Sequence, residues 1–347
     1  MQTVSVIGHF ALGRICLDGQ TVKTKIVTEE LQNRLGKDQV LKIDTHGGVK
    51  TLMKAPLQVI CALKNSKNVL IFPAHNGLRV YAPLLLFFNK FYKRKLHYSV
   101  IGGWLPDFLK KRKHLEKCLK RFNGIYVETN TMKTALEAKG FGNVYVMPNC
   151  KKLTVLTADE LVYPQGVPYK LCTFSRVMKE KGIEDAVNAV ETVNRDAGMT
   201  VFTLDVYGQV DSAQTEWFEE LQSRFPPYIR YKGLVPFDKS VEVLKDYFAL
   251  LFPTYYEGEG FAGTLIDAFS AGVPVIASDW KYNTEIVNTN VGYIYPVGDE
   301  QAFVQVLKSI SGNPSTVLSK KRQCLLEAGK YKIDKAVEIL IKQIESE

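Results

Sequence analysis

The chain has 347 residues, which predicts two domains, since one domain usually takes roughly 150 residues. Hydrophobic residues make up 46% and charged residues 23% of the chain, a composition that excludes disordered and fibrous proteins. The net charge is +9, and the segment 90–121 accounts for all of it with eleven basic and two acidic side chains. A positive excess confined to one segment predicts a local, negatively charged partner.

The six cysteines are scattered, without the paired spacing of a zinc site or the density of a disulfide framework. This usage is typical of a reducing compartment. No apolar run is long enough to span a bilayer, and the first ten residues lack the basic and apolar regions of a signal peptide. We therefore expect a soluble, cytoplasmic protein.

The first half alternates strands and helices. A short strand at 3–8 ends in a glycine, and a helix at 23–35 follows, with apolar residues at helical spacing and Gly36 at its end. Further strands are predicted at 69–72, 97–101, 124–127 and 144–147, with helical patterns between most of them. Such alternation predicts βαβ units in a parallel sheet.

An irregular stretch at 153–168 with two prolines interrupts this pattern, and the alternation then resumes. We predict strands at 169–175, 200–207, 229–231, 248–252 and 273–277, and helices at 183–193, from 216, and at 264–271. An amphipathic helix at 333–344 ends the chain. The predicted fold is α/β with two Rossmann-like domains, 1–163 and 164–330.

Three glycines in the segment 255–279 have the spacing G-x-G-x-x-G, at Gly258, Gly260 and Gly263, and Asp279 follows about 20 residues later. This spacing is that of a dinucleotide-binding loop and allows an NAD(P)-dependent oxidoreductase. However, five residues separate the preceding strand from Gly258, and Glu259 would place an anion beside the pyrophosphate.

Two carboxylates of the same segment, Glu259 and Asp267, lie eight residues apart at the start of a predicted helix. Backbone amides at a helix start can bind a phosphate. The sugar attached to that phosphate would then lie beside Glu259, which would accept hydrogen bonds from its hydroxyls. Asp267, one turn further on, could bind a ribose diol. Alternatively, both acids only complement the helix dipole.

The segment from Glu259 to Asp267 resembles the E-x7-E region of retaining GT-B glycosyltransferases of family 4, whose usual form is E-G-F-G-x-x-x-x-E. Two positions depart from it: Ala262 replaces a glycine, and Asp267 replaces the second glutamate. Weaker similarities keep the same order along the chain. Residues 147–150 resemble the family motif I-P-N-G, residues 174–182 resemble G-R-x-x-x-E-K-G, and residues 283–292 resemble P-E-I-V…G.

The resemblance implies two domains facing across a cleft, with the terminal helix 331–347 returning to the first domain. It also implies transfer of a hexosyl group, with retention, from a nucleoside diphosphate sugar, for which we favour UDP. No cofactor and no metal are expected, and no D-x-D motif is present. The implied catalytic residues are His75 and Glu259, although His75 could instead cap or pack. The implied donor-binding residues are Gly19, Gln20, Arg176, Lys181, Glu259, Gly260, Phe261, Ala262, Gly263 and Asp267.

The basic stretch 90–121 has three interpretations: solvated helix faces, nucleic-acid binding, or contact with an anionic membrane. Apolar and aromatic residues directly precede both lysine-rich runs, which favours the membrane, and each cation near it contributes roughly 1 kcal/mol. The predicted membrane and acceptor surface comprises Lys93, Arg94, Lys95, Trp104, Lys110, Lys111, Arg112 and Lys113.

We therefore expect a cytoplasmic glycosyltransferase, peripheral to the inner face of the membrane, in cell-surface polysaccharide biosynthesis. Its expected partners are a nucleotide sugar, a lipid-linked saccharide acceptor and anionic lipid, and no nucleic acid. An oxidoreductase that uses the glycine spacing, a nucleic-acid-binding protein that uses the basic stretch, and a sugar-nucleotide epimerase of the same fold remain alternatives.

Overall fold

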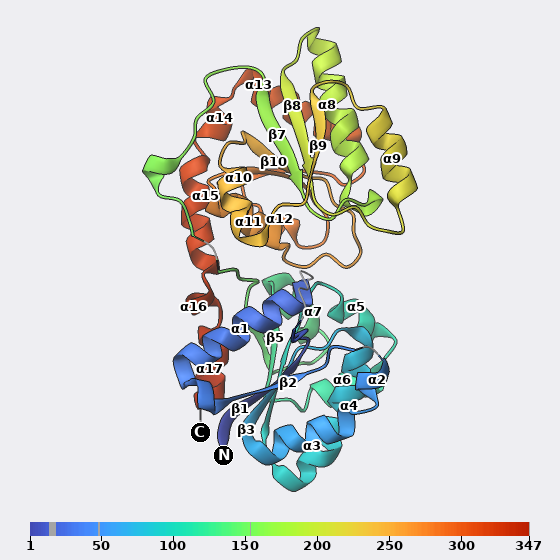
Figure 1. The fold of residues 1–347 in the computed structure, drawn as a ribbon, viewed down its shortest axis with the longest axis vertical. Coiled ribbons are helices and arrows are strands. Elements are labelled where there is room, and N and C mark those ends of the chain that lie inside the picture. The colour runs from blue at the N-terminus through green and yellow to red at the C-terminus, as the bar shows by residue number, and fades with distance from the viewer. Residues whose placement is uncertain (14–18, 48, 153, 347) are drawn as a thin grey trace. The chain divides into compact units, whose positions relative to one another are not determined.

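The computed structural model describes residues 1–346 apart from 14–18, 48 and 153 (Figure 1). The chain forms two compact units, Met1–Lys152 with Tyr331–Glu347, and Leu153–Lys330. The boundary lies eleven residues before the predicted one, because the irregular stretch packs on the second unit. The amide of Leu156 donates to the carbonyl of Ser270 (3.0 Å), and the side chain of Leu161 lies against Gly272.

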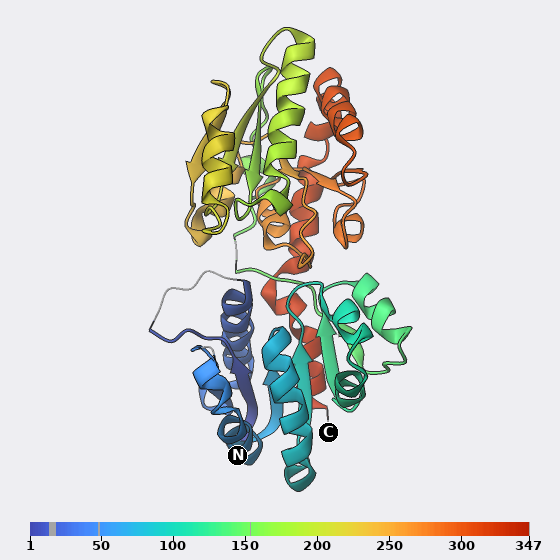
Figure 2. The same ribbon diagram turned by 90° about the vertical axis from the view of Figure 1, so that its right-hand side faces the viewer.

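The first unit contains a six-stranded sheet in the order β2-β1-β3-β4-β5-β6, with every pair parallel (Figures 1 and 2). Its strands are β1 (Gln2–Gly8), β2 (Val40–Asp44), β3 (Ser66–Ile71), β4 (Lys95–Ser99), β5 (Gly124–Val127) and β6 (Val144–Val146). Its helices are α1 (Gly19–Leu35), α2 (Val49–Leu52), α3 (Ala55–Asn65), α4 (His75–Tyr92), α5 (Leu105–Lys110), α6 (Lys113–Leu119) and α7 (Asn130–Glu137).

The second unit has the same architecture, with the strand order β12-β11-β10-β7-β8-β9 and parallel pairing throughout. Its strands are β7 (Tyr169–Phe174), β8 (Phe202–Tyr207), β9 (Ile229–Gly233), β10 (Ala249–Phe252), β11 (Val275–Ser278) and β12 (Gly292–Tyr295). Its helices are α8 (Ile183–Ala197), α9 (Thr215–Ser223), α10 (Ser240–Leu244), α11 (Gly263–Ser270), α12 (Asn283–Ile286), α13 (Glu300–Gly312), α14 (Ser315–Leu318) and α15 (Lys321–Ala328).

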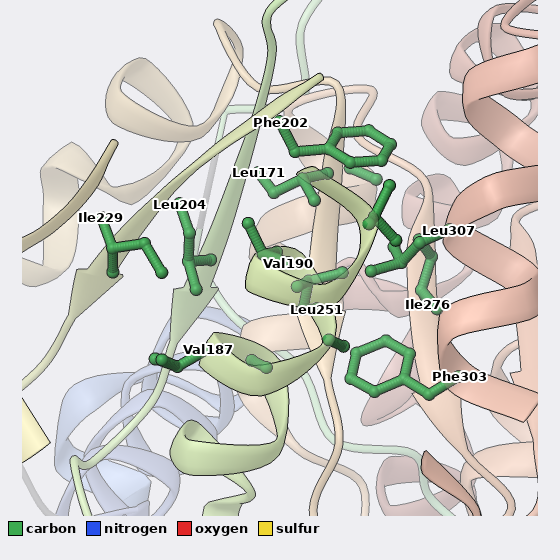
Figure 3. Close-up of a cluster of buried hydrophobic side chains, with 14 of the residues drawn as sticks. Leu171, Val187, Val190, Phe202, Leu204, Ile229, Leu251, Ile276, Phe303 and Leu307 are labelled. Atoms are coloured by element: carbon green, nitrogen blue, oxygen red, sulfur yellow. The ribbon is translucent and has the colours of Figure 1, made fainter. Parts of the chain in front are cut away.

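The described structure also contains short 3-10 helices, at Lys37–Gln39, Ala158–Glu160, Lys179–Lys181, Phe237–Lys239 and Gly329–Tyr331. In the core of the second unit, α8 and α13 pack on one face of the sheet (Figure 3). Val187 and Val190 of α8 and Phe303 and Leu307 of α13 are buried there. None of the helices in the described part of the chain is long and apolar enough to span a lipid bilayer.

The last segment of the chain belongs to the first unit. The sequence predicts one helix over 333–344, and the structure divides it at Val337 into α16 (Ile333–Ala336) and α17 (Glu338–Glu345). Ala336, Leu340 and Ile344 are buried in the core of the first unit, where they share a cluster with strand residues such as Val4. The terminal helical segment is therefore part of that core.

A buried polar network holds the end of α17 to the sheet. Asn68 on β3 donates to the carbonyl oxygens of Ile344 (3.3 Å) and Thr3 (3.0 Å), and its own side-chain oxygen lies 3.1 Å from Nε2 of His97. The other ring nitrogen of His97 lies 3.0 Å from the hydroxyl of Tyr126. Burial, and then the charge of Lys95, lowers the pKa of His97 to about 4.

The buried imidazole of His97 is expected to make the protein sensitive to acid. In the unfolded chain its pKa returns to about 6.5, so the unfolded state takes up the proton first. The stability contributed by the neutral ring is complete above pH 6.5, and about 3 kcal/mol of it is lost as the pH falls to 4. Chemical denaturation of the wild type and of His97→Gln across this range measures the effect. Equal pH slopes for the two proteins would contradict the prediction.

Two glycines of the second unit allow the segments that follow neighbouring strands to approach each other closely. Gly182, before α8, has φ +67°, and a Cβ there would overlap the carbonyl of Pro253 after β10. Gly208, after β8, has φ +136°, and a Cβ there would overlap the carbonyl of Ser175 after β7. Only glycine fits both the backbone conformation and the space.

Gly182→Ala is expected to lower the free energy of unfolding by about 2 kcal/mol or more, since strain at positive φ adds to a backbone overlap. Gly198 is the matched control. It has a similar φ of +63°, but a Cβ there would meet no atom within 4 Å. Gly198→Ala should therefore cost only the conformational part, about 1 kcal/mol. Thermal and urea unfolding of both variants measure the difference, and equal losses would show that the overlap is relieved.

Candidate functional site

The loops at the carboxyl edge of the second sheet bring two predicted donor-binding residues together. Lys181 lies in the 3-10 helix after β7, and Glu259 lies in the segment between β10 and α11. The Lys181 Nζ is 2.5 Å from Oε2 of Glu259, and their side chains are 12% and 7% exposed. The hydroxyl of Thr254 donates to the same carboxylate oxygen (2.8 Å), and the Lys181 ammonium lies 4.9 Å from the centre of the Tyr256 ring. Lys181 and Glu259 thus form a nearly buried ion pair.

Arg176, the other predicted phosphate ligand, follows β7 and points into solvent. Its side chain is 55% exposed, and its Nη1 lies 3.5 Å from Oδ2 of Asp211. An exposed pair of this length contributes little to stability. The guanidinium can therefore exchange Asp211 for a phosphate at small cost.

The glycine-rich segment does not form a dinucleotide-binding turn. In the described segment 249–270, β10 ends at Phe252 and α11 begins only at Gly263. A dinucleotide-binding loop needs its first glycine at the end of the strand. Gly260 and Phe261 are buried, Ala262 and Gly263 are partly buried, and the hydroxyl of Thr264 is buried without a hydrogen-bond partner. The geometry therefore disfavours the oxidoreductase alternative.

Asp267, the predicted ribose ligand, lies on α11 and is buried, with 2% of its surface exposed. Its Oδ1 accepts a hydrogen bond (3.1 Å) from the hydroxyl of Ser240 at the start of α10. Aspartate is one methylene shorter than the glutamate usual at this position, and here it reaches a serine of a neighbouring helix. A contact with ribose stays a prediction.

In the first unit, the implied donor-binding residues Gly19 and Gln20 lie in the first turn of a helix. Asp18 lies outside the described residues, and α1 begins at Gly19. A Cβ at Gly19 would meet no atom within 4 Å, and the side-chain amide of Gln20 donates to the carbonyl of Phe72 (3.0 Å) after β3. These residues are therefore helical, and their contact with the donor phosphates stays a prediction.

Lys23 forms a buried ion pair that the sequence analysis missed. Its Nζ lies 2.6 Å from Oε1 of Glu128, both side chains are 3% exposed, and it also donates to the carbonyl of Val100 (3.2 Å). The partners are 105 residues apart in the sequence, so no local pattern connects them.

His75 is the first residue of α4 and lies against the predicted membrane and acceptor surface. Its ring centroid is 3.9 Å from that of Trp104 and 5.0 Å from that of Phe108. Partial desolvation, and then the positive charge of Arg112, lowers the pKa of His75. The imidazole is therefore neutral at pH 7 and can both donate and accept a hydrogen bond.

The predicted basic surface is only partly available to a partner. Arg94 donates through Nε to the carbonyl of Leu63 (3.1 Å), and Lys95 donates to the carbonyl of Ser346, so both are used within the first unit. Lys110 pairs with Asp107 (2.7 Å), and Lys113 pairs with Glu116 (3.4 Å). The remaining lysines of the predicted surface are nevertheless exposed, namely Lys93, Lys110, Lys111 and Lys113.

Two aromatic side chains of α4, among the residues that precede the first lysine-rich run, are exposed. Phe87 is 56% and Phe91 is 77% exposed, and the Lys90 ammonium lies 5.8 Å from the Phe87 ring centroid. Their i, i+4 spacing puts them on one helix face, a signal that was present in the sequence.

Two histidines that the sequence analysis left without a role also meet at the carboxyl edge of the first sheet. His9 follows β1 and His46 follows β2, and their facing ring nitrogens are 2.7 Å apart. The other ring nitrogen of His9 lies 2.6 Å from the hydroxyl of Thr21. The carboxylate of Asp44 accepts hydrogen bonds from the backbone amides of Phe10, Leu12 and His46. Because β2 was not predicted, its histidine could not be placed.

Comparisons with known proteins relate this chain to glycosyltransferases. Residues 168–313 match the family described as Glycosyl transferases group 1. The GtfA subunit of the UDP-N-acetylglucosamine–peptide N-acetylglucosaminyltransferase of Streptococcus gordonii is 27% identical over 211 residues, 60% of this chain and 40% of that protein. The amylovoran biosynthesis glycosyltransferase AmsK of Erwinia amylovora is 24% identical over 156 residues, 44% of this chain and 38% of that protein. The chain thus spans well under half the length of these curated relatives.

Among solved structures, sucrose-phosphate synthase from Thermosynechococcus elongatus superposes with a TM-score of 0.78 at 15% identity, over 99% of both chains. At this identity the similarity establishes the fold, and it confirms the predicted class of two Rossmann-like α/β domains. The chain therefore has the GT-B fold, and its residues 168–313, which include Arg176, Lys181 and Glu259, match the glycosyl transferases group 1 family.

Proposed function

We propose that this protein transfers a hexosyl group, with retention of configuration, from a UDP-linked sugar to a lipid-linked saccharide in cell-surface polysaccharide biosynthesis. The observation that carries the proposal is the Lys181–Glu259 pair beside the start of α11, within the region of the family match. In this proposal the Lys181 ammonium binds the diphosphate and the Glu259 carboxylate binds sugar hydroxyls, which is supported by the direct contact between the two groups.

The pair suggests how donor binding and sugar recognition are coupled. A diphosphate oxygen that approaches Lys181 competes with Glu259 for the ammonium, and the carboxylate then turns to a hydroxyl of the bound sugar. When the bond between the anomeric carbon and the diphosphate breaks, negative charge grows on the departing UDP. Lys181, Arg176 and the first backbone amides of α11 stabilise that charge, and the proposal involves no metal ion or organic cofactor.

On the first unit, the proposal assigns His75 to a contact with the transferred sugar. Its neutral imidazole can accept a hydrogen bond from a hydroxyl or donate one. Gly19 and Gln20 keep their proposed place near the donor phosphates as the first turn of α1, whose helix dipole favours an anion.

A lipid-linked acceptor is supported by the exposed face of α4. Phe87 and Phe91 project apolar rings into solvent next to the exposed Lys90 and Lys93, and the exposed lysines 110, 111 and 113 lie in the same unit. Apolar rings beside lysines suit an anionic membrane surface, where each cation contributes roughly 1 kcal/mol. We infer that the enzyme works at the inner face of the membrane.

A peptide acceptor is the second candidate, because several of the relatives carry the name of a peptide N-acetylglucosaminyltransferase subunit. AmsK, named for amylovoran biosynthesis, favours a saccharide. Product analysis with a lipid-linked saccharide and with a peptide that carries hydroxyl side chains, each offered with UDP-glucose and UDP-N-acetylglucosamine, separates the two acceptors.

Thermal unfolding with UDP, GDP, ADP and NAD, each at millimolar concentration, tests the donor. A ligand present at 100 times its dissociation constant adds about 2.7 kcal/mol, which raises the midpoint by several degrees. We expect a shift with UDP. A shift with NAD alone would overturn the proposal. Sedimentation with anionic and neutral vesicles, set against a duplex DNA shift assay, tests the membrane surface, and binding to DNA alone would overturn that part.

A further inference from the structure

Four side chains of the first unit form a compact cluster of rings and one cation, which we call the Trp104 cluster: His75, Trp104, Phe108 and Arg112. The ring centroids of His75 and Trp104 are 3.9 Å apart with planes tilted by 31°, and Trp104 meets Phe108 edge-on at 5.1 Å. The guanidinium carbon of Arg112 lies 3.7 Å from the Phe108 ring centroid.

The cluster lies where ligands bind in parallel α/β sheets. His75 follows β3, and Trp104 and Phe108 follow β4, the neighbouring strand. The carboxyl ends of adjacent parallel strands share one edge of the sheet, and ligands of such folds bind outside that edge. The strand order therefore brings together residues that are about 30 positions apart in the sequence.

Hydrogen bonds to the backbone hold the cluster in place. The indole of Trp104 donates to the carbonyl of Ile101 (2.8 Å), and Nη1 of Arg112 donates to the carbonyl of Phe108 (2.9 Å). Yet the cluster is not buried: His75 is exposed and the other three are half-buried. A rigid and accessible group of this kind loses little conformational freedom when it binds a ligand.

Arg112 lacks an acidic partner within the described part of the chain. The acids nearest in sequence are engaged elsewhere: Asp107 pairs with Lys110 (2.7 Å), and Glu116 pairs with Lys120 (2.8 Å) and Lys113 (3.4 Å). The planar guanidinium therefore keeps donors for a carboxylate or a phosphate, the anions that it binds in bidentate fashion.

The rings supply a second kind of contact. The C–H face of a pyranose is apolar and slightly positive, and it stacks on the negative π face of an indole or a phenyl ring. The neutral imidazole of His75 beside it can hydrogen-bond a hydroxyl. The face of the Trp104 indole, next to a guanidinium without an acidic partner among the described residues, therefore suits a sugar and an anion at the same time.

We infer that the Trp104 cluster is an acceptor subsite for a sugar that carries, or directly adjoins, a phosphate or a carboxylate. The inference rests on the proposed function, and it deepens it by assigning a charge to the acceptor. Arg112 binds the anion and Trp104 stacks on the sugar. Phe108, perpendicular to Trp104, positions Arg112, and His75 keeps its proposed contact with the transferred sugar.

Ligand-detected NMR titration of the full chain tests the subsite with four probes: glucose 1-phosphate, glucuronic acid, methyl glucoside and inorganic phosphate. We expect one or both of the anionic sugars to bind at least tenfold more tightly than methyl glucoside and than inorganic phosphate. Comparing the affinities for glucose 1-phosphate and for glucuronic acid shows whether the anion is a phosphate or a carboxylate. In Arg112→Gln the advantage of the anionic sugar should disappear, whereas the exposed Arg121→Gln should leave it unchanged.

A sugar phosphate could also bind to the second unit, so Arg176→Gln is titrated in parallel. Loss of affinity in Arg176→Gln with no loss in Arg112→Gln would overturn the inference, as would equal affinities for neutral and anionic sugars. The UDP-induced thermal shift, measured on the same preparations, reports on the proposed function separately. Without that shift the proposed donor fails, while the comparison of Arg112→Gln with Arg121→Gln still decides the subsite.

Discussion

Replacing Glu128 by alanine is expected to lower the free energy of unfolding by about 3 to 5 kcal/mol, because it leaves the Lys23 ammonium buried without a counterion. Both side chains are 3% exposed, and the Lys23 Nζ lies only 2.6 Å from Oε1 of Glu128. The carbonyl of Val100 remains as an acceptor, but it carries no full charge to balance the ammonium. Urea unfolding at pH 7, followed by circular dichroism, measures the loss.

Two controls isolate the effect of burial. The exposed pair of Lys342 and Glu338 has a similar length of 2.7 Å with side chains 66% and 58% exposed, so Glu338→Ala should cost less than about 1 kcal/mol. The double variant Lys23→Met with Glu128→Leu removes both charges and should regain most of the stability. If the double variant is as unstable as Glu128→Ala, the loss comes from packing and the prediction fails.

Lys181→Met is expected to weaken UDP binding by at least tenfold and to lower kcat/KM of sugar transfer by 100-fold to 1,000-fold, the usual loss when one donor to a developing anion is removed (~3 to 4 kcal/mol). The methionine keeps the length of the side chain but not its charge. The carboxylate of Glu259, 7% exposed, keeps the hydrogen bond from Thr254 and loses its cation. Calorimetric titration with UDP measures the affinity.

Since Lys181→Met also disturbs a nearly buried pair, two further variants keep the prediction testable. Lys179→Ala changes an exposed lysine of the same 3-10 helix and should leave UDP affinity unchanged. Arg176→Gln changes a side chain that is 55% exposed, so it should fold normally and still bind UDP less tightly. Wild-type UDP affinity in both Lys181→Met and Arg176→Gln would remove the two cations from the donor site.

The order of strands and helices could be predicted because each strand is a short apolar run between turn residues. Two strands escaped prediction for local reasons. β2 (Val40–Asp44) has a lysine at its centre and only one fully buried residue. β12 (Gly292–Tyr295) starts with a glycine, packed directly against the carbonyl of Val275 on β11. In both, pairing with a neighbouring strand compensates for a weak local pattern.

By itself the sequence determined the α/β class, the break between two units, and the Lys181 and Glu259 motifs, because periodicity and motif spacing act over a few residues. Only the tertiary structure decided the partners. Lys181 with Glu259, Lys23 with Glu128 and His75 with Trp104 are separated by 78, 105 and 29 positions. Such pairs form because the order of strands in each sheet places distant loops at one edge, and that order arises from packing of the whole unit.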